Sequence, residues 1–194
     1  MRTDGHGRDW RGSDQGPRES GSSARPGRRA GGLACSPGCT MNSRPLVITH
    51  VDAESGFSGG EVQVFLLLEG LRERGHRCVL VAPPSSRALA HAEQRGFEVR
   101  ALAMRNDADL GAVLGLSRAL RELAPDLVHL HTGRAAWLGA LACRRSGHTA
   151  IVTRRMERRI KRGLGTRLVY GSRTAAVVAI APAIRDELAR AGVA

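Results

Sequence analysis

Short apolar runs alternate with segments of helical spacing from Arg44 onward. Runs rich in Val, Ile and Leu predict strands at 45–51, 77–83, 97–104, 126–132, 149–154 and 175–181. The segments between them predict connecting helices. Because the strand runs are almost entirely apolar, both faces of the sheet should be covered, as in a parallel sheet with right-handed crossovers. We therefore expect an α/β fold, a doubly wound, Rossmann-like sheet with the strand order 3-2-1-4-5-6.

Residues 1–43 break this pattern. The first forty residues hold 9 Gly, 3 Pro and 5 Ser, and Leu33 is almost their only aliphatic residue. Such a segment cannot bury enough surface to offset the entropy of ordering. The sequence therefore predicts a disordered tail over 1–43 and one domain over 44–194. Met41 stands just before the first strand, so a mis-called start codon is an alternative explanation of the tail.

The apolar runs also bear on compartment. None approaches the length of about 18 residues that a membrane-crossing helix needs, and no apolar region follows the basic pair Arg28 and Arg29 as a secretory signal would require. The four cysteines are Cys35, Cys39, Cys78 and Cys143, and the pair Cys35 and Cys39 in the tail has no second ligand pair. Reduced thiols in a cytosolic protein explain them better than disulfides or a metal.

Three glycines lie between the first predicted strand and the helix that follows it. Gly56, Gly59 and Gly60 precede Glu61, which falls in the first turn of that helix. Glycine lets backbone come close to a ligand, and a helix N-terminus presents unpaired N–H groups that favour an anion. The loop predicts a phosphate or sugar-phosphate ligand. A tight turn that needs glycine for its own geometry is the alternative, and both stay open.

A second group of polar residues follows the fourth strand. His129 and His131 alternate onto one face of that strand, and Thr132 and Arg134 come directly after it. Ligands of open parallel sheets collect at this edge, near the switch point between the first and fourth strands. His131 is therefore a candidate general base or phosphate ligand. A structural histidine bonded to a backbone carbonyl is the alternative for both histidines.

Other nucleotide-binding classes do not fit. A nicotinamide dehydrogenase needs G-x-G-x-x-G and an acidic residue after the second strand, whereas this loop reads G-F-S-G-G-E and the second strand ends in Ala-Pro-Pro. A P-loop fails because no G-K-[ST] follows the glycines. A receiver domain fails because the first and third strands do not end in an acidic cluster.

Several long stretches resemble a known family. "SGFSGGEVQVFLLLEGLRERGHRCVLVAP", "PDLVHLHTGRAAWLGALA", "TAIVTRR" and "VVAIAPAIRDELARAGV" look like the N-terminal domain of family 4 glycosyltransferases of GT-B fold, with nearly colinear spacing over 44–194. The resemblance implies a retaining, metal-independent enzyme that needs no cofactor besides its nucleotide-sugar substrate. In that family the N-terminal domain binds the acceptor, and a C-terminal domain with an E-x7-E motif binds the donor. We expect this chain to supply only the acceptor-side half and to be inactive alone.

The resemblance also assigns residues. Gly59 and Gly60, with Glu61, would face the donor phosphates, and His131 would line the cleft as the candidate catalytic residue. Where many relatives have T-x-H, this chain has T-R-R. The implied acceptor and anion-binding residues are Arg134, Thr153, Arg154 and Arg155.

Basic residues concentrate between positions 144 and 173. Against the single acid Glu157, this segment holds Arg144, Arg145, Arg154, Arg155, Arg158, Arg159, Lys161, Arg162, Arg167 and Arg173. Near an anionic surface each would contribute about 1 kcal/mol, so an anionic membrane or a phosphorylated lipid-linked acceptor is an expected partner. A solvated basic face is the alternative. Nucleic acid is unlikely as a partner, because only Tyr170 could stack on a base nearby.

The sequence thus predicts half of an enzyme that transfers a sugar from a nucleotide-sugar to a cell-envelope glycan or lipid-linked acceptor. We expect it in the cytoplasm, with the inner face of the cytoplasmic membrane as its working surface. A non-catalytic, anion-binding Rossmann module is the alternative.

Overall fold

The computed structural model describes residues 44–157 and 159–193. The predicted tail 1–43, the alternative start at Met41 and the cysteines Cys35 and Cys39 lie outside the described residues. So does Arg158 of the basic segment.

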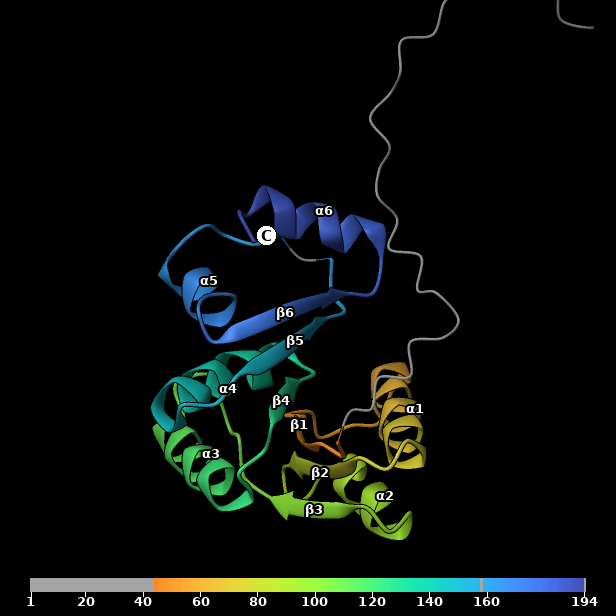
Figure 1. Cartoon of the computed structure of the whole chain (residues 1–194). Helices are drawn as coiled ribbons and strands as arrows, with labels where there is room; N and C mark the ends of the chain where they lie inside the picture. Colours follow the sequence, from red (N-terminus) through yellow and green to blue (C-terminus); the bar gives the residue numbers. More distant parts are fainter. Residues whose placement is uncertain (1–43, 158, 194) are drawn as a thin grey trace, which may run out of the picture. The chain divides into compact units, whose positions relative to one another are not determined.

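Six parallel strands form one sheet in the order β3-β2-β1-β4-β5-β6, which confirms the predicted topology (Figure 1). The strands are β1 (Val47–Val51), β2 (Arg77–Ala82), β3 (Glu98–Ala101), β4 (Leu127–Leu130), β5 (Ala150–Arg154) and β6 (Thr174–Ala179). The helices are α1 (Gly59–Glu73), α2 (Arg87–Gln94), α3 (Leu110–Leu123), α4 (Gly133–Ser146), α5 (Leu164–Val169) and α6 (Pro182–Arg190).

The two edge strands differ from the prediction. Strand β3 ends at Ala101 rather than at 104, and β6 ends at Ala179 rather than at 181. Helices cover both faces of the sheet, as expected, but these two strands are less buried than the central ones. Each has a partner strand on one side only, and Val178 and Ile180 at the end of β6 remain 44% and 47% exposed. An apolar run in the sequence does not distinguish a central strand from an edge strand.

A separate apolar core covers each face of the sheet. One core joins α3, α4 and α5 to the central strands through Leu116, Leu120 and Leu138, all at most 1% exposed. The other joins α1 and α2 to β2 through Leu68 and Leu80, both 0% exposed (Figure 1). Leucines repeated at helical spacing supply these faces, and the strands are buried between them.

The two described cysteines behave as predicted. Cys78 and Cys143 are free and buried, and burial raises the pKa of Cys78 to about 11 and of Cys143 to about 12. Among the residues that the structure describes, no helix combines the length and the apolar character that crossing a membrane requires.

The topology brings two loops to one edge of the sheet. Strands β1 and β4 are neighbours with His50 and His129 in register, and their carboxyl ends run into the loops that open α1 and α4. Strand β5 ends beside them. This is the switch point of the sheet, where the order of strands reverses.

Candidate functional site

The start of α1 is held by a capping box. The Ser58 side chain accepts from the backbone of the first turn, and the Ser58 N–H donates to the Glu61 carboxylate. Burial raises the pKa of Glu61, but its hydrogen bonds with Ser58 outweigh burial and leave the pKa below its usual value. The sequence signal for this role is S-x-x-E at 58–61. Glu61 therefore fixes the helix start that opens the site.

The three glycines of the loop have different surroundings. A Cβ added at Gly60 would lie 2.9 Å from Nη1 of Arg155, whereas one added at Gly56 or Gly59 would meet no atom within 4 Å. None of the three has a positive φ, so the turn itself does not require glycine at these positions. Gly60 instead makes room for an arginine side chain.

A pocket of about 320 Å³ opens at this edge of the sheet. Of the residues that the sequence singled out, Gly60, Glu61, His131, Thr153, Arg154 and Arg155 line it, together with Ser58, Thr132, Gly133 and Tyr170. Gly59 and Arg134 do not belong to its lining. The volume falls in the range of small-molecule sites.

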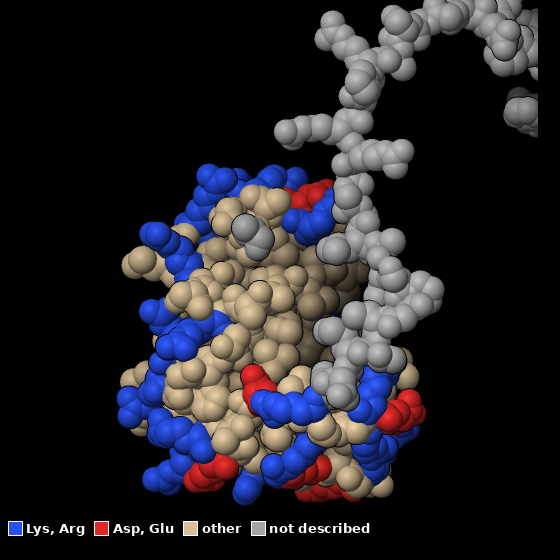
Figure 2. All heavy atoms as spheres, viewed as in Figure 1, with Lys and Arg blue, Asp and Glu red and all other residues tan. Residues whose placement is uncertain are grey.

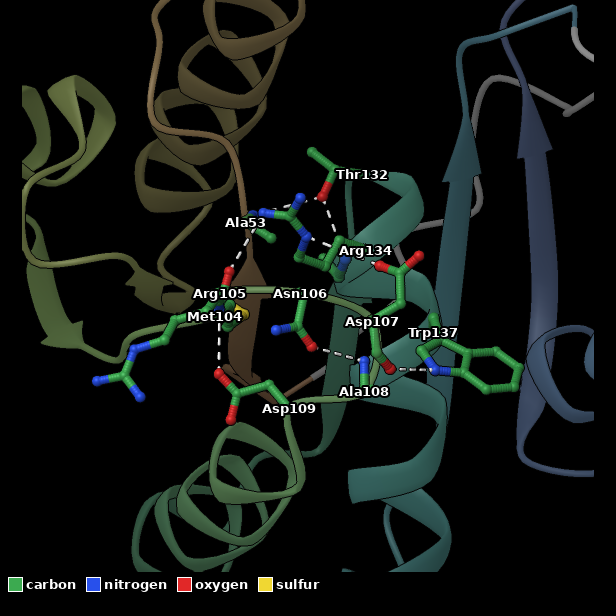
Figure 3. A network of polar contacts seen from close by, with 11 residues as sticks. Ala53, Met104, Arg105, Asn106, Asp107, Ala108, Asp109, Thr132, Arg134 and Trp137 are labelled. Atoms are coloured by element: carbon green, nitrogen blue, oxygen red, sulfur yellow. Dashed lines mark hydrogen bonds and ion pairs between the residues drawn. The ribbon is translucent and has the colours of Figure 1, made fainter.

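Arg134 lies on α4 and points toward the loop before α3 (Figure 3). Its Nη1 donates to the carbonyl of Met104 at 3.2 Å, and its Nε is 3.7 Å from Oδ1 of Asp107. Trp137, one turn further along α4, donates from Nε1 to the Asp107 carbonyl at 2.7 Å (Figure 3). In the structure Arg134 therefore anchors this loop to α4 outside the pocket. Its role in anion binding stays a prediction.

Three buried histidines lie beneath the pocket. Nδ1 of His50 is 3.0 Å from Nε2 of His131, Nδ1 of His131 is 3.3 Å from Nη2 of Arg155, and Nε2 of His129 is 2.7 Å from Oγ1 of Thr153. In these contacts the partners of His129 and His131 are side chains, not the backbone carbonyl of the structural alternative. His131 is only 2% exposed, and both of its ring nitrogens face protein groups.

Burial keeps these histidines neutral. It lowers the pKa of His50 to about 3, with help from His129, and that of His129 to about 4, with help from Arg155. It lowers the pKa of His131 well below the ordinary value. One nitrogen from each ring lies within 4.8 Å of the others, so neutral imidazoles at this spacing could hold a transition-metal ion. The neighbouring guanidinium of Arg155 opposes a further positive charge there.

Arg155 is one of the two arginines that line the pocket. Burial lowers its pKa, while the carboxylates of Asp52 and Glu61 act in the opposite direction. An arginine side chain still carries its charge at neutral pH. Burial also raises the pKa of Asp52 to about 6, and its Oδ1 accepts from the Glu54 N–H at 2.9 Å. Sequence reasoning missed Asp52 and His50, because single residues near a strand end carry no motif.

The arrangement suits a phosphate. Helices α1 and α4 both begin at the pocket, with Gly60 and Gly133 in its wall. Their N-terminal N–H groups and dipoles favour an anion, and Arg154 and Arg155 add two guanidinium groups. Nη1 of Arg154 donates to the Tyr170 hydroxyl at 3.2 Å. The pocket can bind an anion, but the hydrogen bonds of His131 leave neither of its nitrogens directed at one.

Comparisons with known proteins identify a family and a fold. Residues 57–194 match the family model described as Glycosyltransferase Family 4. No curated protein sequence matches the chain. Among solved structures, Anabaena HepE in complex with UDP and glucose is similar with a TM-score of 0.61 and 16% identity over 77% of this chain and 42% of HepE.

Two further structures show how widely the fold is used. The lipopolysaccharide outer core galactosyltransferase WaaB has a TM-score of 0.58 and 14% identity over 76% of this chain and 43% of WaaB. A putative UDP-N-acetylglucosamine 2-epimerase from Listeria monocytogenes has a TM-score of 0.56 and 13% identity over 77% and 43%. The chain thus spans less than half the length of each of these proteins. Such distant likeness shows the fold and not the reaction.

Proposed function

Because the chain belongs to glycosyltransferase family 4, we propose that it forms the acceptor-side half of a GT-B enzyme. This enzyme would transfer a sugar from a nucleotide-sugar to a cell-envelope glycan or a lipid-linked acceptor. Following the family resemblance, the transfer would retain the configuration of the sugar and use no metal ion. The chain would work in the cytoplasm at the inner face of the membrane.

The pocket at the switch point is the observation that supports this proposal. The missing side chain of Gly60 leaves space for the Arg155 guanidinium at the start of α1, so a guanidinium and two helix N-termini line the same pocket. A diphosphate carries the charge that these groups favour. HepE has been crystallised with UDP and with UDP-glucose, and we infer that a donor diphosphate approaches the corresponding edge here.

A second hollow next to this pocket supports an anionic acceptor. It shares Gly133, Ala136, Arg154 and Tyr170 with the first pocket and continues to Arg159, Lys161 and Arg162. Figure 2 shows Lys and Arg side chains gathered along the upper rim, over α5 and α6. WaaB is named for an acceptor of the cell envelope, the lipopolysaccharide outer core. We infer that this basic surface meets a phosphorylated or lipid-linked acceptor.

We assign the described residues binding roles rather than proton transfer. His131, the candidate catalytic residue of the sequence, has both nitrogens engaged by His50 and Arg155. Arg155 would hold the diphosphate and stabilise the charge that develops on it as the sugar leaves. A GT-B enzyme holds its reactants between two domains, and positioning contributes about 7–11 kcal/mol to lowering a barrier in favourable cases. We therefore expect the 194-residue chain alone to bind without transferring sugar.

The engaged nitrogens of His131 also favour the second candidate, an anion-binding module without turnover. The two functions differ in one experiment. The 194-residue chain is supplied with a second polypeptide that carries the C-terminal half of a family 4 enzyme, a panel of nucleotide-sugars and an anionic lipid extract. Sugar transfer that Arg155→Gln abolishes supports the glycosyltransferase. Pyrophosphate binding without any transfer supports the module.

Gly60 allows a sharper test of the pocket. In Gly60→Ala the new methyl group would crowd Nη1 of Arg155 and shift the guanidinium, and we expect weaker binding of inorganic pyrophosphate, by at most about 1.5–3 kcal/mol, the range for a hydrogen bond to a charged group. Gly56→Ala is the matched control, because its methyl group meets no atom within 4 Å. Isothermal titration of both variants checks this. Equal affinity in the two would contradict a diphosphate site at Gly60.

A further inference from the structure

We propose that His50 is a positioning residue: it fixes the tautomer of His131, which in turn holds the Arg155 guanidinium in the pocket. The inference rests on the proposed function, since it concerns the group that we assign to the donor diphosphate. It adds a buried residue of β1 that no motif of the sequence indicates.

The tautomer follows from the partners of His131. A guanidinium has only donors, so Nδ1 of His131, 3.3 Å from Nη2 of Arg155, must accept. The ring is neutral, since burial lowers its pKa well below the ordinary value. Its single proton therefore sits on Nε2, which donates to Nδ1 of His50 at 3.0 Å. With the opposite tautomer, two N–H groups would point at each other between His131 and Arg155.

The same reasoning fixes the tautomer of His50. Because Nδ1 of His50 accepts, its own proton must sit on Nε2. That atom is buried and has no hydrogen-bond partner among the described residues. A buried donor without a partner costs about 1–3 kcal/mol. A purely structural role would favour an apolar residue here. The retained histidine is explained by the acceptor that its Nδ1 provides.

Arg155 has a hydrogen-bond anchor in this pair, in addition to the charges of Asp52 and Glu61. Nε of Arg155 is also buried without a hydrogen-bond partner among the described residues, and Gly60 leaves the space that its guanidinium occupies. The lone pair of His131 is thus a direct anchor of the guanidinium inside the pocket. Loss of the acceptor on His50 would free His131 to take the other tautomer, which repels Arg155.

Substitutions at His50 separate this role from packing. In His50→Asn the amide oxygen can take the place of the Nδ1 acceptor, whereas His50→Leu removes it, and His50→Gln, which places its amide further out, serves if the leucine variant does not fold. His148→Asn is the control, since His148 follows the far end of α4. Imidazole nitrogen spectra of the full chain report which nitrogen of His131 carries the proton. The side-chain N–H signals of Arg155 report whether the guanidinium is held.

We expect the proton of His131 on Nε2 in the wild type and in His50→Asn, with Arg155 signals unchanged. In His50→Leu or His50→Gln the pattern should change, the Arg155 signals should broaden, and affinity for inorganic pyrophosphate should fall at least about tenfold. Rescue by asparagine should hold even if its unfolding midpoint is lowered. The ligand-free spectra decide the positioning role even if pyrophosphate fails to bind, a result that would refute only the proposed function.

Three outcomes would overturn the inference. The first is a wild-type His131 protonated on Nδ1. The second is an Arg155 spectrum that does not respond to the loss of the His50 acceptor. The third is one-to-one binding of Zn²⁺ that His50→Asn abolishes, because the nitrogens of His50 and His131 would then face a cation rather than share a proton.

Discussion

Acid should destabilise this protein through its buried histidines, and His129 allows the effect to be isolated. The pKa of His129 is about 4 in the folded chain, against the ordinary value of 6.5 that we take for the unfolded chain. Between these values the unfolded chain binds more protons, so stability is fully present above pH 6.5 and is lost as the pH falls. A pH of 5 lies 1.5 units below the pKa of His129 in the unfolded chain. At 1.36 kcal/mol per unit, the folded chain has then lost about 2 kcal/mol of stability.

Comparison with His129→Gln isolates this contribution. Glutamine can retain a hydrogen bond to Thr153, the partner of His129, but it does not titrate. Asp52 acts in the opposite direction, since burial raises its pKa to about 6 and the folded chain gains stability as Asp52 takes up its proton on acidification. Arg155 and Asp52 are present in both proteins, so their contributions largely cancel in the difference. His129 also lowers the pKa of His50 and of His131, so its removal lessens their acid loss and changes the difference in the same direction.

Urea unfolding followed by far-ultraviolet circular dichroism at pH 7.5 and pH 5.0 measures the effect. The wild type should lose about 2 kcal/mol more than His129→Gln, a difference of about 1 M in the urea midpoint for a typical slope. His148→Gln is the matched control and should change the loss less, because that ring is half-buried and its pKa is lowered only modestly. An equal loss in the wild type and in His129→Gln would refute the reasoning.

Further predictions concern packing, capping and charge. Gly139→Ala should lower stability by about 1–3 kcal/mol in urea unfolding, because the added methyl group would clash with Cδ2 of Leu130. An unchanged midpoint would contradict this packing. Thr132→Ala should cost about 1 kcal/mol, since its hydroxyl accepts from the N–H of Ala135 and caps α4; thermal unfolding checks it, and no loss would mean that the cap is dispensable. The chain should sediment with anionic vesicles but not with neutral ones, and 0.5 M salt should release it. Binding that salt does not weaken would exclude an electrostatic surface.

Much of the fold follows from the sequence because the responsible patterns are local. Apolar runs bounded by turn residues located six strands in the order that the sheet adopts, since right-handed crossovers leave few ways to connect them. The errors lie at the sheet edges. An edge strand such as β6 has the same apolar composition as a central strand, and only the position of neighbouring strands decides which side chains are covered.

The candidate site was located more accurately than its chemistry. Gly60, His131, Thr153 and Arg155 do meet in one pocket, because the carboxyl ends of β1, β4 and β5 share an edge. Arg134 was expected among them, but its side chain contacts Met104 and Asp107 in the loop before α3. The spacing along the chain placed it near the edge, whereas the direction of its side chain depends on contacts with a loop 30 residues away.

The sequence by itself determined the class of fold and brought most of the candidate residues to one edge of the sheet, whereas the anionic ligand that it predicts stays a prediction. These depend on periodicity, on glycine and on charge, which act within a few residues. The tertiary structure alone decided that His50 lies against His131 across 81 residues of chain, and that Gly60 leaves space for Arg155, the residue after β5. Strand register and burial set which nitrogen holds a proton, and neither is defined until the whole sheet has assembled.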